Sequence, residues 1–195
     1  MKLDYLLFKK INDLAGQSNV ADWMAVFGAR YLIVVIAASL LRYIFIYKNK
    51  AQKYLNLMVV GNAILAVGLG LFTNFIISLF VQRPRPYELG LGENIYGQAW
   101  LADSFPSEHT TMAFALAMAV FLTHRKFGTV LLVLAGVVGL SRIYVGIHYP
   151  LDVLVGALIG VCMAYASVKW ITPLVFLLKK PPALQARGPE RKSKL

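Results

Sequence analysis

The stretch FGTVLLVLAGVVGLSRIYVGIHYPLD, residues 127–152, decides the fold of this protein. Its first part, residues 127–147, is mostly apolar over about the 20 residues that a helix needs to cross a bilayer. Its last part holds Arg142, His148 and Asp152, which are polar side chains gathered where the run ends. The stretch therefore predicts a membrane helix with chemically active groups at one end.

Four further stretches are apolar over a similar length, so the chain is expected to cross the membrane several times. Helices are favoured over a barrel because the apolar runs are continuous, whereas barrel strands alternate apolar and polar residues. The sequence predicts an all-α, polytopic membrane helical bundle of about five transmembrane helices. The five predicted spans are Trp23–Tyr47, Leu55–Val81, Phe105–Thr123, Phe127–Ile147 and Leu151–Leu178.

The composition excludes other classes of protein. Of the 195 residues, 58% are hydrophobic and 15% are charged, which argues against both a water-soluble globule and a disordered chain. The one cysteine, Cys162, excludes a disulfide-stapled fold. The net charge of +11 is assigned to cytoplasmic loops and a basic tail rather than to nucleic-acid binding. The expected partner is therefore the lipid bilayer, and no nucleic acid is expected to bind.

The two ends of the chain differ from the apolar body. Between residues 2 and 14, apolar side chains recur at helical spacing, which predicts an N-terminal helix lying along the membrane interface. These side chains are Leu3, Leu7, Ile11 and Leu14. Residues 181–195 are basic, contain prolines and lack apolar periodicity, which predicts a disordered tail. We therefore expect one membrane-embedded domain over residues 1–180 and a disordered basic cytoplasmic tail over residues 181–195.

Lysines and arginines set the expected orientation, because cytoplasmic loops carry an excess of both. They gather between spans one and two, between spans three and four, and after span five, whereas nearly all acidic residues fall on the opposite side. The C-terminus is therefore expected inside the cell.

Arg30 and Arg42 interrupt the first span. Each lies near enough to one end of the span for its side chain to snorkel to the membrane interface. The alternative is that Arg30 turns into the bundle toward an anion.

Three polar clusters occur at the outward ends of the predicted spans. The clusters are Arg83-Pro84-Arg85-Pro86, Pro106-Ser107-Glu108-His109, and Ser141-Arg142 through His148 to Asp152. They converge on one membrane face, where they predict a functional site.

His148 and Asp152 are spaced i to i+4. If a helix begins near Tyr149, with Pro150 in its first turn, Asp152 lies one turn below His148 and its carboxylate holds one ring nitrogen. The other ring nitrogen is then presented as a base or nucleophile. A purely structural pair is the alternative interpretation of this spacing.

Ser107 and His109 begin a predicted membrane helix, where backbone N–H groups and the helix dipole favour phosphate. Ser107 either caps the helix or binds a phosphoryl oxygen, and His109 is a candidate proton donor. Arg85 and Arg142 offer planar cationic forks for phosphate oxygens. For Arg83 the choice is between the same role and anchoring to lipid headgroups.

These residues resemble the type 2 phosphatidic acid phosphatase superfamily, whose signature has three parts. The second part, Pro-Ser-x-His, and the third part, Ser-Arg, five residues, His, three residues, Asp, match completely at residues 106–109 and 141–152. The first part, a Lys followed seven residues later by Arg-Pro, matches only at Arg85-Pro86, because Ser78 stands at the lysine position. Arg83 and Arg30 are the candidates to replace that cation.

The resemblance implies a phosphatase that needs no metal or other cofactor. It implies that His148 attacks phosphorus to form a phosphohistidine, that Asp152 orients His148, and that His109 protonates the departing oxygen. It further implies that Arg85, Arg142 and Ser107 hold the phosphoryl oxygens.

Within the superfamily, residues 105–111 and 142–150 and the short layout are similar to bacterial undecaprenyl-diphosphatases of the bacitracin-resistance type. This implies a polyprenyl diphosphate substrate and recycling of the peptidoglycan lipid carrier at the outer face of the bacterial cytoplasmic membrane. Two alternatives stay open: another lipid phosphatase, acting on phosphatidylglycerophosphate, lipid A or phosphatidic acid, and a non-enzymatic lipid-binding or transport protein. Glu108 stands where these enzymes usually have Asp, and an acidic residue there also suits a helix start.

Overall fold

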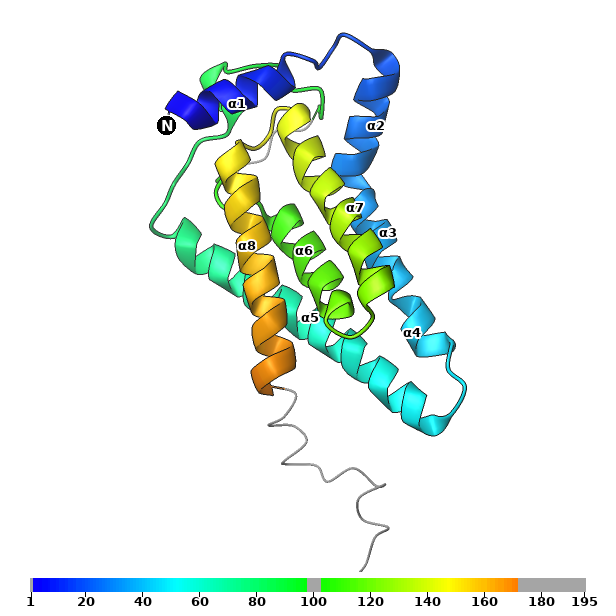
Figure 1. Ribbon diagram of the computed structural model, residues 1–195. Coiled ribbons are helices and arrows are strands. Elements are labelled where there is room, and N and C mark those ends of the chain that lie inside the picture. The colour runs from blue at the N-terminus through cyan, green and yellow to red at the C-terminus, as the bar shows by residue number, and fades with distance from the viewer. Residues whose placement is uncertain (1, 98–102, 172–195) are drawn as a thin grey trace, which may run out of the picture.

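The computed structural model describes residues 2–97 and 103–171, and within these ranges it is helical with no strand (Figure 1). The α-helices are α1 (Lys2–Asn12), α2 (Asn19–Arg30), α3 (Leu32–Ser39), α4 (Leu41–Phe45), α5 (Lys50–Ser78), α6 (Glu108–Phe121), α7 (Arg125–Tyr144) and α8 (Pro150–Ala166). A 3-10 helix, η1, covers Pro86–Leu89, and a π-helical turn, η2, covers Ser167–Ile171. The all-helical class expected from the sequence is confirmed for the described residues.

Three of these helices are long and apolar enough to cross a membrane: α5, α7, and α8 with its extension to Trp170. A fourth candidate span is α2 followed by α3 and α4, which the sequence predicted as one helix over Trp23–Tyr47 and which instead bends by 48° after Arg30. The end of the fifth predicted span, residues 172–178, and the predicted tail, residues 181–195, lie outside the described residues.

Helix α6 lies at the centre of the bundle and packs against α3, α5, α7 and α8. Its 14 residues extend about 21 Å at 1.5 Å per residue, which is shorter than the roughly 30 Å hydrocarbon core. Small and apolar residues on every side of α6 are fully buried, including Ala113, Ala117 and Val120. Its sequence is apolar all round because protein surrounds it, so apolar length alone does not show that it crosses the bilayer.

Glycines let α8 approach α6 closely. A Cβ atom added to Gly156 would meet the backbone oxygen of Ser107, and one added to Gly160 would meet backbone atoms of Thr111 and Ala115. Small residues at such crossings allow helix backbones to pack in direct contact. This contact fixes the start of α8 beside the start of α6, and therefore sets where their first residues lie.

Helix α1 lies across one end of the bundle, where α2 and α8 begin and α7 ends (Figure 1). Its inner face packs on the protein: the Phe8 ring lies 5.5 Å from that of Tyr149, and buried Asn12 donates to the backbone oxygens of Glu93 and Tyr144. Its outer face exposes Leu3 and Leu7, as expected for a helix lying at an interface. We call this the α1 end of the bundle.

Replacing Gly160 with Ala should destabilise the protein, because the new methyl group would push α8 away from the α6 backbone. We expect a loss of about 1 to 3 kcal/mol, the usual cost of overpacking, measured as a lower unfolding temperature in detergent. Gly136→Ala in α7 is the matched control, since a Cβ there meets nothing within 4 Å. Equal unfolding temperatures for the two variants would contradict the close packing of α6 and α8.

Candidate active site

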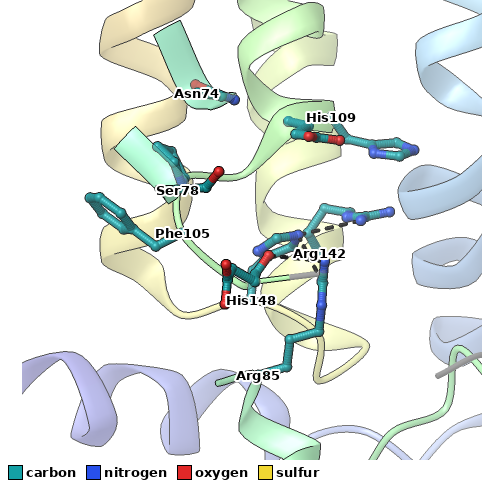
Figure 2. Close-up of a pocket in the computed structure, with 10 residues that line it drawn as sticks. Asn74, Ser78, Arg85, Phe105, His109, Arg142 and His148 are labelled. Carbon is teal, nitrogen blue, oxygen red and sulfur yellow. Dashed lines mark hydrogen bonds between the residues drawn. The ribbon is translucent and has the colours of Figure 1, made fainter. Parts of the chain in front are cut away.

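A cavity of about 200 Å³ opens near the α1 end of the bundle (Figure 2). It is lined from four parts of the chain: the C-terminal end of α5, Arg85 directly before η1, the loop and first residues of α6, and the segment from Arg142 to His148. The lining residues are Asn74, Ser78, Arg85, Asp103, Phe105, Pro106, Glu108, His109, Arg142 and His148. The convergence predicted for the three polar clusters is therefore present in the fold.

The imidazole of His148 is held in one orientation within the protein. The residue is 2% exposed, and its Nδ1 lies 2.8 Å from the backbone oxygen of Ser104. Because a carbonyl only accepts hydrogen bonds, we assign the proton to Nδ1, which donates to Ser104. The lone pair of Nε2 then points into the cavity.

Two guanidinium groups lie beside this lone pair. Arg85 Nη1 and Arg142 Nη2 are each 3.3 Å from His148 Nε2, and Figure 2 shows both side chains ending at the ring. Backbone oxygens fix the two arginines: Arg85 donates to Ile147 at 3.1 Å, and Arg142 donates to Ala29 at 3.2 Å. The geometry concentrates positive charge around one nucleophilic nitrogen.

Arg142 also offers a hydrogen-bond donor without an acceptor. It is 3% exposed, and its Nε is buried with no hydrogen-bond partner among the described residues. A buried donor left unpaired costs about 1 to 3 kcal/mol. An oxyanion entering the cavity would supply acceptors for guanidinium groups that are already in place.

Asp152 lies next to His148, but it does not accept the Nδ1 proton as the spacing predicted. The distance from Asp152 Oδ2 to His148 Nδ1 is 3.6 Å, which is too long for a hydrogen bond. Oδ2 instead accepts from the Ser104 hydroxyl and, at 2.8 Å, from the backbone N–H of Tyr149. Ser104 therefore stands between the two residues: its carbonyl holds the imidazole and its hydroxyl holds the carboxylate.

Ser104 was not predicted from the sequence, because it lies 44 residues from His148 and belongs to none of the three clusters. Its position depends on the packing of the loop before α6 against the start of α8. No spacing pattern in the sequence signals that contact.

Two of the predicted phosphate ligands, Ser107 and Arg83, are not among the residues that line this cavity. The Ser107 hydroxyl is buried against the Thr110 hydroxyl at 2.9 Å, and the Ser107 backbone N–H donates to the backbone oxygen of Asp152. The guanidinium of Arg83 lies between the carboxylates of Asp152 and Asp4, so it binds protein groups rather than an open anion site. His109, in contrast, lines the cavity together with His148.

The position of the family lysine is occupied by small polar groups. Ser78 lines the cavity with Asn74, and the Ser78 hydroxyl donates to the backbone oxygen of Phe75. Arg30 is not among the cavity-lining residues: its guanidinium lies 4.6 Å from the centre of the Tyr96 ring and donates to the Tyr96 backbone oxygen. The cations among the cavity-lining residues are therefore Arg85 and Arg142.

Burial is the main influence on the charge of His148. The pKa of His148 is lowered from its usual 6.5 to about 4, mainly by desolvation and also by the charges of Arg142 and Arg85, against the opposite effect of Asp152. Burial also lowers the pKa of Arg85. At neutral pH the imidazole is therefore uncharged, and its unprotonated Nε2 carries the lone pair that a nucleophile needs.

The same architecture is found in known proteins. The model of the PAP2 superfamily matches residues 56–175, which include all of the cavity-lining segments. The chain belongs to the PAP2 superfamily. This confirms the resemblance drawn from the Pro-Ser-x-His and Ser-Arg-His-Asp motifs.

Relatives within this superfamily match most of the chain. The bacitracin transport permease protein BcrC of Bacillus licheniformis is 32% identical, over 94% of this chain and 88% of its own length. The undecaprenyl-diphosphatase BcrC of Bacillus subtilis strain 168 is 34% identical, over 84% and 81% respectively. Among solved structures, LpxE of Aquifex aeolicus aligns with a TM-score of 0.64 and 30% identity, covering 86% of this chain and 96% of its own.

The depressed pKa of His148 is directly measurable. In protein labelled with ¹⁵N-histidine, the ring signals that are lost in His148→Ala should remain those of a neutral imidazole at pH 6 and titrate with a midpoint near pH 4. Bound inorganic phosphate should raise this midpoint, because an anion beside the arginines favours the imidazolium. A midpoint at or above 6.5 without phosphate would contradict the buried, guanidinium-flanked geometry.

Proposed function

We propose that this protein is a membrane-embedded phosphatase that hydrolyses undecaprenyl diphosphate to undecaprenyl phosphate and phosphate. The observation that carries the proposal is the approach of two guanidinium groups to within 3.3 Å of the cavity-facing nitrogen of a buried, neutral imidazole. Such a site favours a phosphoryl group because it offers both a nucleophile and fixed positive charge. The substrate follows from the relative of Bacillus subtilis that is named for this activity.

In the first step, Nε2 of His148 attacks the terminal phosphorus of the diphosphate. A P–N bond forms, and the bond between that phosphorus and the bridging oxygen breaks. Arg85 and Arg142 stabilise the charge on the phosphoryl oxygens, while the Ser104 carbonyl keeps the Nδ1 proton in place. The product left on the protein is a phosphohistidine.

His109 acts as the proton carrier, because it lines the same cavity and its ring bears a titratable nitrogen. It protonates the departing oxygen of undecaprenyl phosphate. It then accepts a proton from the water that attacks the phosphohistidine, so that the P–N bond breaks and inorganic phosphate leaves. The two half-reactions together consume one water and need no metal ion or other cofactor.

The proposal extends to the placement of the protein in the cell. We place five transmembrane segments, including α6, in the bacterial cytoplasmic membrane, with the site at the outer face and the C-terminus in the cytoplasm. Lys48 between α4 and α5, the lysines of the first turn of α5, and the basic residues at the start of α7 support this orientation. We assign the catalytic domain to residues 1–180 and treat residues 181–195 as a separate basic segment.

An assay of purified protein in detergent with EDTA tests this proposal. We expect phosphate release from undecaprenyl diphosphate to exceed that from phosphatidylglycerophosphate, lipid A or phosphatidic acid. His148→Ala should lower turnover by at least about 1,000-fold, as loss of a nucleophile does. His109→Ala should lower turnover by roughly 100- to 10,000-fold, the usual range for a general acid.

His124→Ala is the matched control, because His124 precedes α7 and packs on the Tyr43 ring away from the cavity. It should keep full activity. Turnover that survives His148→Ala would remove the proposed nucleophile, and turnover that EDTA abolishes would refute the metal-free mechanism. Hydrolysis of none of the lipids would favour a binding or transport protein.

A further inference from the structure

The N-terminal helix reaches the active site through a chain of charged groups. Arg83 donates through Nη1 to Oδ1 of Asp152 and through Nη2 to Oδ2 of Asp4. The second oxygen of Asp4, Oδ1, accepts the backbone N–H of Leu151 at 2.8 Å. A residue of α1 therefore contacts both the cation that holds Asp152 and the first turn of the helix that carries Asp152.

These charged groups are largely shielded from water. The side chains of Arg83, Asp4 and Asp152 are 22%, 11% and 0% exposed. The guanidinium of Arg83 also lies 3.9 Å from the centre of the Tyr149 ring. Removing one partner from such a pair leaves a poorly solvated charge behind, so the remaining groups are forced to rearrange.

Each acceptor oxygen of the Asp152 carboxylate is accounted for by this arrangement. Oδ1 receives Arg83, and Oδ2 receives the Ser104 hydroxyl and the Tyr149 N–H. Ser104 in turn accepts the proton of His148 Nδ1. A shift of Arg83 would therefore pass to the imidazole through Asp152 and Ser104, without any contact between Arg83 and substrate.

We propose that Asp4 and Arg83 are positioning residues for phosphoryl transfer, and that α1 is part of the catalytic unit rather than only a membrane anchor. The inference rests on the proposed function, because it concerns the reaction of His148. Asp4 holds Arg83 and the start of α8, Arg83 holds Asp152, and Asp152 holds Ser104 against the imidazole. This series of contacts controls the direction in which Nε2 of His148 approaches phosphorus.

Kinetics of Asp4→Asn, Arg83→Gln and the double variant test the proposal, with undecaprenyl diphosphate as the probe. Asn keeps an oxygen for the Leu151 N–H but loses the charge that holds Arg83. We expect each single variant to lower kcat by roughly 10- to 100-fold, the cost of a small misplacement of reacting groups, with KM within about twofold because neither residue contacts substrate. The double variant should be no slower than Arg83→Gln, since both changes interrupt the same series of contacts.

Two further variants separate positioning from general stability. Arg83→Lys keeps the charge and should recover part of the kcat lost in Arg83→Gln. Asp13→Asn is the matched control: Asp13 follows α1, is 55% exposed and pairs with Lys9 at 3.8 Å, so its kcat should equal that of wild type. Unfolding temperatures measured in parallel show whether a slow variant is folded at the assay temperature.

These measurements distinguish failure of the positioning role from failure of the proposed phosphatase activity. Wild-type protein that hydrolyses no lipid phosphate would end both claims. If wild type is active and His148→Ala is not, then wild-type kcat in Asp4→Asn and Arg83→Gln would overturn the positioning role alone. So would a loss confined to KM, or a double variant whose loss is the product of the two single losses.

Discussion

The structure depends on the burial of three basic side chains around one point. Arg85, Arg142 and His148 are 6%, 3% and 2% exposed, and their nitrogens meet at Nε2 of the imidazole. Positive charges in a poorly solvated site repel one another strongly, so the arrangement needs compensation. Peptide oxygens of Ile147, Ala29 and Ser104 provide it, and the imidazole contributes by remaining uncharged. A phosphoryl group completes this compensation, which is the physical basis for binding it.

The helices explain how three distant segments come to this point. The glycines of α8 bring its backbone against the short central α6, so the loops before both helices meet. Arg142 comes from the last turn of α7, and the residues from 145 to 149 return the chain directly to the start of α8. Helix α1 closes the same end and joins it through Asp4 and Asn12. The reacting groups therefore sit on rigid elements, which suits a reaction that is catalysed mainly by positioning.

Sequence reasoning predicted the helical class and the groups at the cavity, because motif spacing places His109, Arg142 and His148 at the ends of adjacent helices. It did not indicate the contacts that depend on how loops pack. The i to i+4 spacing indicated that Asp152 is near His148, but Ser104, which takes the hydrogen bond, comes from a remote loop. Arg83 has the side-chain chemistry of a phosphate ligand, yet its guanidinium already donates to Asp4 and Asp152. Hydropathy also cannot separate a helix surrounded by lipid from one surrounded by protein, as α6 shows.

The central claim is that Nε2 of His148 becomes covalently bonded to phosphorus. It is tested most directly by mixing the protein with undecaprenyl diphosphate carrying ³²P in the terminal phosphate, quenching within one turnover, and mapping the label by peptide digestion under alkaline conditions. We expect an acid-labile, alkali-stable label on the peptide that contains His148. Turnover with no trapped label at any quench time, or a label on another residue, would contradict it.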